Sequence, residues 1–302
     1  MKHIDLLKNC LLCNRKCEVN RLKGELGVCS AGDSIRIARA ALHLWEEPPI
    51  SGENGSGTVF FSHCNFKCVF CQNHEISQNY NGATISIERL SDIFLELQQK
   101  GANNINLVTP THYVPQIIEA LDIAKVKGLK LPILYNTNGY DSLDTIKYLD
   151  GYIDVYLPDF KYFNNKYAIK YSKVTDYKDN LIPVLKEMVR QTGSPKFDDN
   201  GLITKGVIIR HLMLPGLLFD SKKVIDTIYK TFGNQVYISI MNQYTPMFKA
   251  YEYPEINKRL NSKHYESLIN YASEIGVING FIQDSEASST DFVPSFNLEG
   301  VI

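Results

Sequence analysis

From residue 58 onward, short apolar runs alternate with longer segments whose apolar residues recur three and four positions apart. A run of about four to six apolar or β-branched residues is typical of a buried parallel strand, whereas the longer spacing predicts the buried face of a helix. We predict strands at residues 58–61, 105–108, 131–135, 152–157, 206–210 and 236–241, and a short last strand at 278–282.

The segments between these strands contain typical helix boundary residues. Ser86 is a candidate N-cap for a helix that Gly101 would stop. The helix after residue 108 has Pro115 near its first turn, and Asp141 is a candidate cap for the next helix. Further helical segments are predicted at about 164–191, 220–233 and 262–275.

At least six strand–helix repeats in series predict a parallel α/β fold with right-handed crossovers, either barrel-like or doubly wound. The first 50 residues differ, because they carry four cysteines and are too few to supply much core of their own. A bound metal would give such a segment a physical reason to fold. We predict a cysteine-rich, metal-binding segment at 1–50 and a main domain at 51–302, whose first residues are the glycine-rich SGENGSG stretch.

Composition excludes some partners. Hydrophobic residues make up 44% and charged residues 22% of the 302-residue chain, which is ordinary for a globular protein. A formal net charge of −1 gives no general attraction to nucleic acid or to anionic membranes. No apolar stretch approaches the ~18 residues of a spanning helix. We expect a cytoplasmic protein with neither nucleic acid nor membrane as a partner.

The seven cysteines all precede residue 72 and fall into two groups. Their odd number, in a long chain with no apolar signal core, argues against a disulfide framework. Clustered thiols in such a chain more often bind a metal or carry out redox chemistry. The first group is Cys10, Cys13, Cys17 and Cys29, and the second is Cys64, Cys68 and Cys71.

Polar residues gather directly after each of the six main predicted strands. Polar loops would explain one or two such cases, but six in succession indicate one shared site, because the carboxyl ends of parallel strands meet on one face. In chain order these residues are the second cysteine group; Thr109, Thr111 and His112; Asn136 and Asn138; Asp159 and Lys161; Arg210 and His211; and Asn242, Gln243 and Tyr244.

The second cysteine group, spaced C-x3-C-x2-C, supplies three thiolates and no fourth. Zinc requires a fourth ligand, which His63 or His74 offers, but the spacing is tight and the intervening residues are bulky. A [4Fe–4S] cluster held by three thiolates keeps one iron open for a non-protein ligand. The ligand count therefore favours such a cluster at Cys64, Cys68 and Cys71.

With the aromatic Phe70 before its last cysteine, this motif resembles the signature of the radical S-adenosylmethionine (SAM) superfamily. The resemblance implies that the open iron binds the amino and carboxylate groups of SAM. It further implies reductive cleavage of SAM to methionine and a 5′-deoxyadenosyl radical, which abstracts hydrogen from a substrate. The electron would come from a reductant such as flavodoxin or ferredoxin.

The wider chain resembles the activating enzymes of glycyl radical proteins such as pyruvate formate-lyase. It is most similar to an uncharacterised branch labelled pyruvate formate-lyase activating enzyme-like. The likeness covers nearly the whole length and implies a partial (β/α)6 TIM-like barrel rather than a complete eight-fold one. The stretches that carry it are GSGT (55–58), LVTPTHY (107–113), NTNG (136–139), PDFKY (158–162) and RHLMLPG (210–216).

The same resemblance implies roles for several strand-end residues. Asp159 and Lys161 match an Asp-x-Lys pair whose Asp helps to hold a monovalent cation beside the SAM carboxylate, whereas Asn136 replaces the usual Asp of its segment. Arg210 matches an arginine that lies by the cofactor. Thr109 and Thr111 stand where the family has a Gly-Gly-Glu run that receives the SAM amino group, and are candidates for that contact.

Some of these residues have an equally ordinary structural interpretation. Asn138 is also a turn former before Gly139, and Gln243 is either a packing residue or an adenine contact. His211 is either a hydrogen-bonded loop histidine or a group in proton or hydrogen transfer. The candidate cofactor-binding residues are Thr109, Thr111, Asn136, Asn138, Asp159, Arg210 and Gln243, and the candidate catalytic residues are Lys161 and His211.

The first cysteine group, spaced C-x2-C-x3-C-x11-C, has four thiols and is able to close a metal site. A structural zinc ion held by Cys10, Cys13, Cys17 and Cys29 is one interpretation. A second, fully ligated iron–sulfur cluster that relays electrons is the other.

Three functions are compatible with the sequence. The first is a radical SAM enzyme that forms a glycyl or other radical on a protein partner. The second applies the same chemistry to a small molecule or peptide, and the third is a non-catalytic zinc or iron–sulfur interaction module. The six polar strand ends argue against the third, because a binding module has little need of an open-iron cluster facing a polar pocket.

Overall fold

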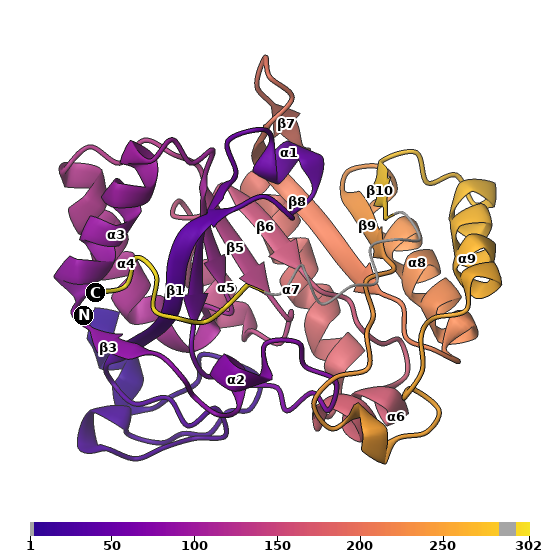
Figure 1. The fold of residues 1–302 in the computed structure, drawn as a ribbon, viewed down its shortest axis with the longest axis horizontal. Coiled ribbons are helices and arrows are strands. Elements are labelled where there is room, and N and C mark those ends of the chain that lie inside the picture. Colours follow the sequence, from indigo (N-terminus) through magenta and orange to yellow (C-terminus); the bar gives the residue numbers. More distant parts are fainter. Residues whose placement is uncertain (1–2, 284–293) are drawn as a thin grey trace.

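A ten-stranded sheet forms the centre of the protein in a computed structural model that describes residues 3–283 and 294–302. The strand order is β10-β9-β8-β6-β5-β4-β2-β1-β3, and β7 pairs with β8 off this path (Figure 1). The strands are β1 (Ile35–His43), β2 (Ser56–Phe61), β3 (Ala83–Ile85), β4 (Ile105–Val108), β5 (Ile133–Thr137), β6 (Val155–Pro158), β7 (Lys196–Phe197), β8 (Ile203–Leu212), β9 (Tyr237–Met241) and β10 (Gly280–Ile282).

Along the path β2-β4-β5-β6-β8-β9-β10 every neighbouring pair is parallel, whereas the short β7 pairs antiparallel with β8. All residues of β2, β4 and β6 are buried, as expected for strands covered on both faces. The sheet does not close, because β3 and β10 lie at its two free edges. The predicted α/β partial barrel is therefore confirmed, and the short last strand at 278–282 is present as β10.

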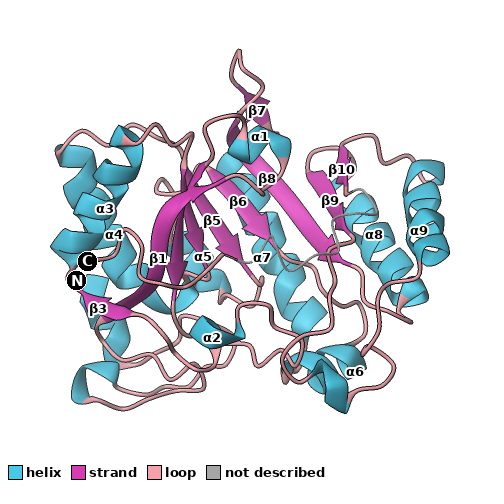
Figure 2. Ribbon diagram, viewed as in Figure 1, coloured by secondary structure: helices cyan, strands magenta, loops and turns pink. Residues whose placement is uncertain are grey.

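The longer helices lie between successive strands and flank the sheet (Figure 2). Among them, α3 packs against α4, α5 against α7, and α8 against α9. The helices are α1 (Pro48–Ser51), α2 (His74–Ser77), α3 (Ile87–Gln99), α4 (Val114–Val126), α5 (Leu143–Tyr148), α6 (Asn165–Tyr167), α7 (Tyr177–Thr192), α8 (Leu218–Phe232) and α9 (Ser262–Glu274).

One predicted helix cap is confirmed and another is wrong. The Ser86 side chain accepts a hydrogen bond from the Arg89 backbone N–H and caps α3, as predicted. Helix α5 is capped by Ser142 instead of Asp141. The Asp141 side chain points inward, where three hydroxyl groups donate to it, and is therefore not available as a cap.

Strand β1 lies within the segment that we predicted as a metal-binding appendage. It pairs antiparallel with β2, and β3 pairs with its outer edge. The C-terminal residues cross it, and the Ala40 N–H donates to the Glu299 carbonyl at 2.8 Å. Residues 35–43 of this segment therefore belong to the sheet, and the boundary at residue 50 stays a prediction.

No helix within residues 3–283 and 294–302 combines the length and the apolar character that crossing a bilayer requires.

Candidate active site

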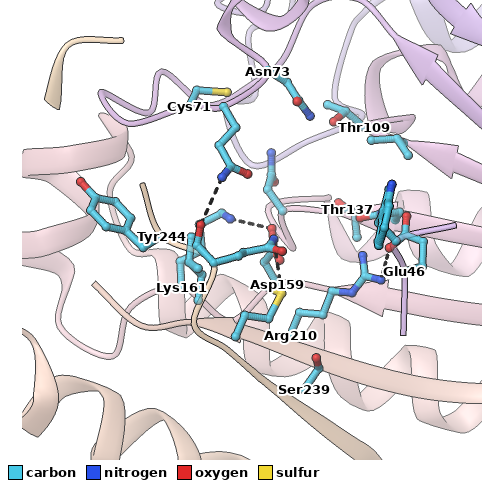
Figure 3. Close-up of a pocket in the computed structure, with 18 of the residues that line it drawn as sticks. Glu46, Cys71, Asn73, Thr109, Thr137, Asp159, Lys161, Arg210, Ser239 and Tyr244 are labelled. Carbon is cyan, nitrogen blue, oxygen red and sulfur yellow. Dashed lines mark hydrogen bonds and ion pairs between the residues drawn. The ribbon is translucent and has the colours of Figure 1, made fainter. Parts of the chain in front are cut away.

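A cavity of about 360 Å³ opens at the carboxyl ends of the parallel strands. Figure 3 shows side chains from several strand ends pointing into it. The sulfur-bearing loop after β2 forms one wall, and strands β5, β6, β8 and β9 contribute from the other side. The predicted residues that line the cavity are Cys64, Cys68, Cys71, Thr109, Asn136, Asn138, Asp159, Lys161, Arg210 and Gln243.

The loop after β2 brings three sulfurs to this cavity, from the buried Cys68 and the half-buried Cys64 and Cys71. Burial raises the pKa of Cys64 to about 11 and that of Cys68 to about 12, and it also raises the pKa of Cys71. Burial has this effect because it disfavours the charged thiolate. These thiols therefore ionise readily only when a cation compensates the charge, which is what a metal ligand requires.

Each of the three sulfurs also has a hydrogen-bonding neighbour. The Phe66 backbone N–H donates to the Cys64 sulfur at 3.4 Å. The Ser172 hydroxyl lies 3.0 Å from the Cys68 sulfur, and the Ser77 hydroxyl lies 3.3 Å from the Cys71 sulfur. Donors at these positions stabilise ionised sulfur in a metal site.

Asp159 and Lys161 form an ion pair of 2.6 Å beside the sulfurs. They lie two positions apart at the end of β6, so their side chains point to the same side, as predicted. Burial alone would lower the pKa of Lys161, but the charges of Asp159 and Cys68 outweigh burial and raise it. Lys161 is therefore held as a cation next to the cysteine loop.

The Tyr177 hydroxyl holds two of the strand ends together. It lies 2.9 Å from the Asn138 carbonyl and 2.6 Å from the Asp159 carbonyl, which share its single proton, and it accepts from the Lys161 backbone N–H at 3.1 Å. Gly139 is required in the adjoining turn, because its φ is +77° and a Cβ there would lie 2.8 Å from the Asp159 carbonyl oxygen. The relative position of Asn138 and Asp159 is thus set by buried contacts.

Arg210 is paired with two glutamates that the sequence pattern did not single out. Its guanidinium contacts Glu46 at 2.5 Å and Glu47 at 2.9 Å. Burial alone would raise the pKa of the Glu47 carboxyl, but Arg210 outweighs burial and holds it below its usual range. Both glutamates directly precede α1, in the stretch EEPP (46–49). Two adjacent carboxylates before two prolines were the feature of the sequence that could have pointed to them.

Three glutamines close another side of the cavity. The Gln72 amide donates to the Gln243 carbonyl at 3.3 Å, and the Gln283 amide donates to the Gln243 side-chain oxygen at 3.1 Å. Tyr244 packs edge-on against Phe70, and its hydroxyl donates to the Ile256 carbonyl at 2.7 Å. Gln243 is therefore the polar group of this pair that faces the cavity.

The strand-end residues and their cavity are characteristic of one family. Residues 58–228 match the sequence model of the radical SAM superfamily, which is more than half of the chain. The chain belongs to the radical SAM superfamily. The match includes the three cysteines and Arg210, but it excludes Glu46, Glu47 and Gln243.

Two further comparisons show what this chain is similar to. The uncharacterised protein MJ0674 of Methanocaldococcus jannaschii is 35% identical over 282 residues, which is 89% of this chain and 76% of that protein. Streptococcus suis SuiB bound to precursor peptide SuiA is similar in fold, with a TM-score of 0.51 and 15% identity over 73% of this chain and 46% of SuiB. SuiB bound to S-adenosylmethionine is similar in fold, with a TM-score of 0.50 and 16% identity over 73% of this chain and 48% of that SuiB chain. This chain thus spans about half the length of the SuiB chains, and at this identity the likeness shows the fold alone.

The geometry fits the [4Fe–4S] cluster and SAM that the radical SAM family uses. Three cysteine sulfurs, each with a hydrogen-bonding neighbour, open onto a cavity that also contains an ion pair and several amide groups. Among residues 3–283 and 294–302, no group of three or more His, Cys, Asp or Glu side chains is arranged as a ready site for a metal ion. This holds for both cysteine groups.

Thr111 and His211 do not reach this cavity, in contrast to what the sequence pattern indicated. The Thr111 hydroxyl donates to Asp141 at 2.7 Å. His211 lies 2.7 Å from the Phe160 carbonyl through Nδ1, and burial lowers its pKa to about 4. Successive strand residues point to opposite faces, so Arg210 faces the cavity and its neighbour His211 faces away.

Proposed function

We propose that Cys64, Cys68 and Cys71 hold a [4Fe–4S] cluster and that the 360 Å³ cavity binds SAM against it. The observation that carries the proposal is the placement of three cysteine sulfurs and the Asp159–Lys161 pair on one cavity. A reduced cluster of this kind supplies one electron that breaks a carbon–sulfur bond of SAM and releases methionine and a 5′-deoxyadenosyl radical.

The residues of this chain bind and orient the cofactor in that reaction. Asn136 and Thr109 lie at the ends of neighbouring strands, where their oxygens and amide suit the amino and carboxylate groups of SAM. The Asp159 carboxylate suits the ribose hydroxyls, and Lys161 balances its charge. The Gln243 amide suits the edge of the adenine ring.

Apolar side chains next to the sulfurs protect the radical. Phe66 and Phe70 line the same cavity and are buried, so they keep water from the reacting carbon. Arg210, fixed by Glu46 and Glu47, presents no free charge that would draw water in.

We propose further that the hydrogen donor is a polypeptide segment, as in the activating enzymes of glycyl radical proteins. The cavity wall includes Trp45, which follows β1 and is 59% exposed, and Ile282, which lies in the edge strand β10 and is 57% exposed. Exposed aromatic and aliphatic side chains at a cavity suit a peptide chain. We place the reaction in the cytoplasm, with flavodoxin or ferredoxin as reductant.

Anaerobic reconstitution with iron and sulfide, followed by reduction in the presence of SAM, tests the chemistry. We expect 5′-deoxyadenosine from the wild-type chain and none from a variant with Cys64→Ala, Cys68→Ala and Cys71→Ala together. Cleavage that survives in the triple variant contradicts the cluster assignment. If the wild-type protein binds the cluster but does not cleave SAM, the proposal that it is a radical SAM enzyme is contradicted.

Deuterium transfer tests the substrate class. Extract from cells grown on deuterated medium is separated by size, and each fraction is added to the reduced enzyme. We expect deuterium in 5′-deoxyadenosine only with the macromolecular fraction, and loss of transfer after protease treatment. Deuterium transfer from the small-molecule fraction alone would contradict a polypeptide substrate and would indicate a free metabolite as the hydrogen donor.

A further inference from the structure

The first cysteine group converges on a second, much smaller cavity that the radical SAM site does not use. Cys10, Cys13, Cys17 and Cys29 all line this space of about 20 Å³, although they span twenty positions of loop. The rest of its wall consists of Arg15, Arg21, Thr111 and His112 together with Leu12, Val19 and Gly27. The convergence comes from folding, because the segment before β1 has only two short 3₁₀ turns to organise it.

The backbone next to these cysteines is shaped to present their sulfurs. Non-glycine residues with positive φ flank Cys17 on both sides, Lys16 at +46° and Glu18 at +56°, and another, Ser30 at +61°, follows Cys29. Such conformations are uncommon outside glycine. The Val28 N–H donates to the Cys17 sulfur at 3.4 Å, and a Cβ on Gly27 would lie 2.8 Å from that sulfur.

Arg21 is a buried cation without an opposite charge. Its side chain is 1% exposed, and its guanidinium donates to backbone carbonyls of Gly32 at 3.0 Å and His112 at 2.6 Å. In the part of the chain that the structure describes, no carboxylate pairs with it. A buried charge is costly unless it is compensated, so this position favours anionic groups in the adjoining cavity.

Three further polar atoms around the cavity have no hydrogen-bond partner among the described residues. They are Arg15 Nη2, His112 Nδ1 and Asn65 Nδ2. Asn65 is 1% exposed, and its side chain also lies close enough to Cys13 to interact with the thiol. Two of the three atoms are N–H donors, which is the type of group that surrounds thiolate metal centres.

We propose that Cys10, Cys13, Cys17 and Cys29 hold a second metal centre, closed by four thiolates and separate from the SAM cluster. A zinc ion or a fully ligated [4Fe–4S] cluster has the required thiolate chemistry, and either leaves net negative charge on the four sulfurs. That charge compensates Arg21. Metal binding would require the four sulfurs to move closer together, because they are not arranged as a ready site for one ion among the described residues.

This centre also braces the loop that carries the SAM cluster. Cys13 forms a β-bridge with Asp141, and the Arg15 side chain donates to the Asn65 carbonyl at 2.9 Å. Asn65 follows Cys64 directly, and its side-chain oxygen accepts from the Asn138 amide at 2.6 Å. The four-cysteine segment therefore contacts both the cysteine loop and the turn after β5.

The metal content of the full chain tests this proposal without any reference to SAM chemistry. We use the variant with Cys64→Ala, Cys68→Ala and Cys71→Ala, purified without oxygen, and measure zinc, iron and sulfide. We expect ~1 zinc, or ~4 irons with matching sulfide, per chain. A zinc content near one per chain would identify a structural ion, and iron with matching sulfide would identify a second cluster. A folded variant that retains neither metal overturns the proposal, while leaving the SAM site untested by this result.

Two further variants in that background locate the metal. Cys13→Ser with Cys17→Ser should remove it, and Arg21→Met should increase its rate of loss to a chelator at least several-fold. Arg39→Met, which removes a surface ion pair with Glu299, is the matched control and should leave the rate unchanged. If the serine variants fail to fold, cobalt loading of the background variant still gives thiolate-to-cobalt absorption. Absence of that absorption, or equal chelator rates for all variants, contradicts the four-cysteine centre.

Discussion

Two of the three cysteines assigned to the SAM cluster face serine hydroxyls, and one of these serines belongs to a longer chain of contacts. Ser172 lies 3.0 Å from the Cys68 sulfur and 2.8 Å from the Tyr162 hydroxyl. Ser172 can therefore donate to sulfur while it accepts from Tyr162. Hydrogen bonds to the sulfurs are one of the means by which a protein sets the potential of an iron–sulfur cluster.

Ser172→Ala should make the reduction potential of the SAM cluster more negative by roughly 40 mV, since a net hydrogen bond contributes about 1 kcal/mol and one electron is transferred. The reason is that the lost donor stabilises the more negative, reduced cluster. The potential is measured by a redox titration followed by electron paramagnetic resonance. Ser91→Ala is the control, because Ser91 is buried in α3 and lies outside the cavity. A potential that is unchanged or less negative contradicts this role for Ser172.

The end of β8 shows how one strand separates a site residue from a structural residue. Arg210 faces the cavity, whereas His211 is 1% exposed and lies against the Phe160 carbonyl. Because burial lowers the pKa of His211 to about 4, the ring is neutral in the folded protein at neutral pH. An unfolded chain would bind a proton at this residue near pH 6.5.

The free energy of unfolding should therefore fall as the pH decreases from about 6.5 towards 4, because the unfolded state then binds more protons than the folded state. His211 alone contributes about 2 kcal/mol of this loss at pH 5. His211→Gln should flatten the dependence, as measured by urea unfolding at pH 7 and pH 5. His264→Gln, at an exposed position of α9, should leave it unchanged. Equal slopes for His211→Gln and the wild type would show that folding does not lower the pKa of His211.

At the scale of the whole molecule, the cavity is completed by residues from outside the series of parallel strands. Glu46 and Glu47 follow β1 and reach Arg210 of β8 across a sequence separation of about 160 positions. Strand β1 must therefore be in place next to β2 for the two carboxylates to meet the guanidinium. The loop before the barrel is thus part of the site.

Glu47→Ala should lower the free energy of unfolding by about 3 kcal/mol, because it leaves a buried guanidinium short of one of its two carboxylates. The measurement is denaturant unfolding, and the double variant with Arg210→Met should lose less than the sum of the two single changes. Glu53→Ala, at an exposed position just beyond α1, is the control. Additive losses in the double variant would show that the pair does not interact.

Local features of the sequence predicted much of the fold and part of the site. Apolar runs identified the parallel strands, since strands buried on both faces need them. Their carboxyl ends identified the residues around the cavity, and the three-cysteine spacing indicated the SAM cluster. The weakly alternating IRIARAALH segment did not identify β1, because its alanines and arginines do not form an apolar run.

The sequence by itself determined which residues lie at the strand ends, because the positions of apolar runs along the chain and the cysteine spacing are local properties. Only the tertiary structure decided which of those side chains meet. The pleat of β8 points His211 away from the cavity. The Thr111 side chain packs towards Asp141, and the path of β1 brings Glu47 to Arg210. The four N-terminal cysteines likewise share one cavity only after the loops fold against the barrel, because contacts between distant residues are set by packing and not by spacing.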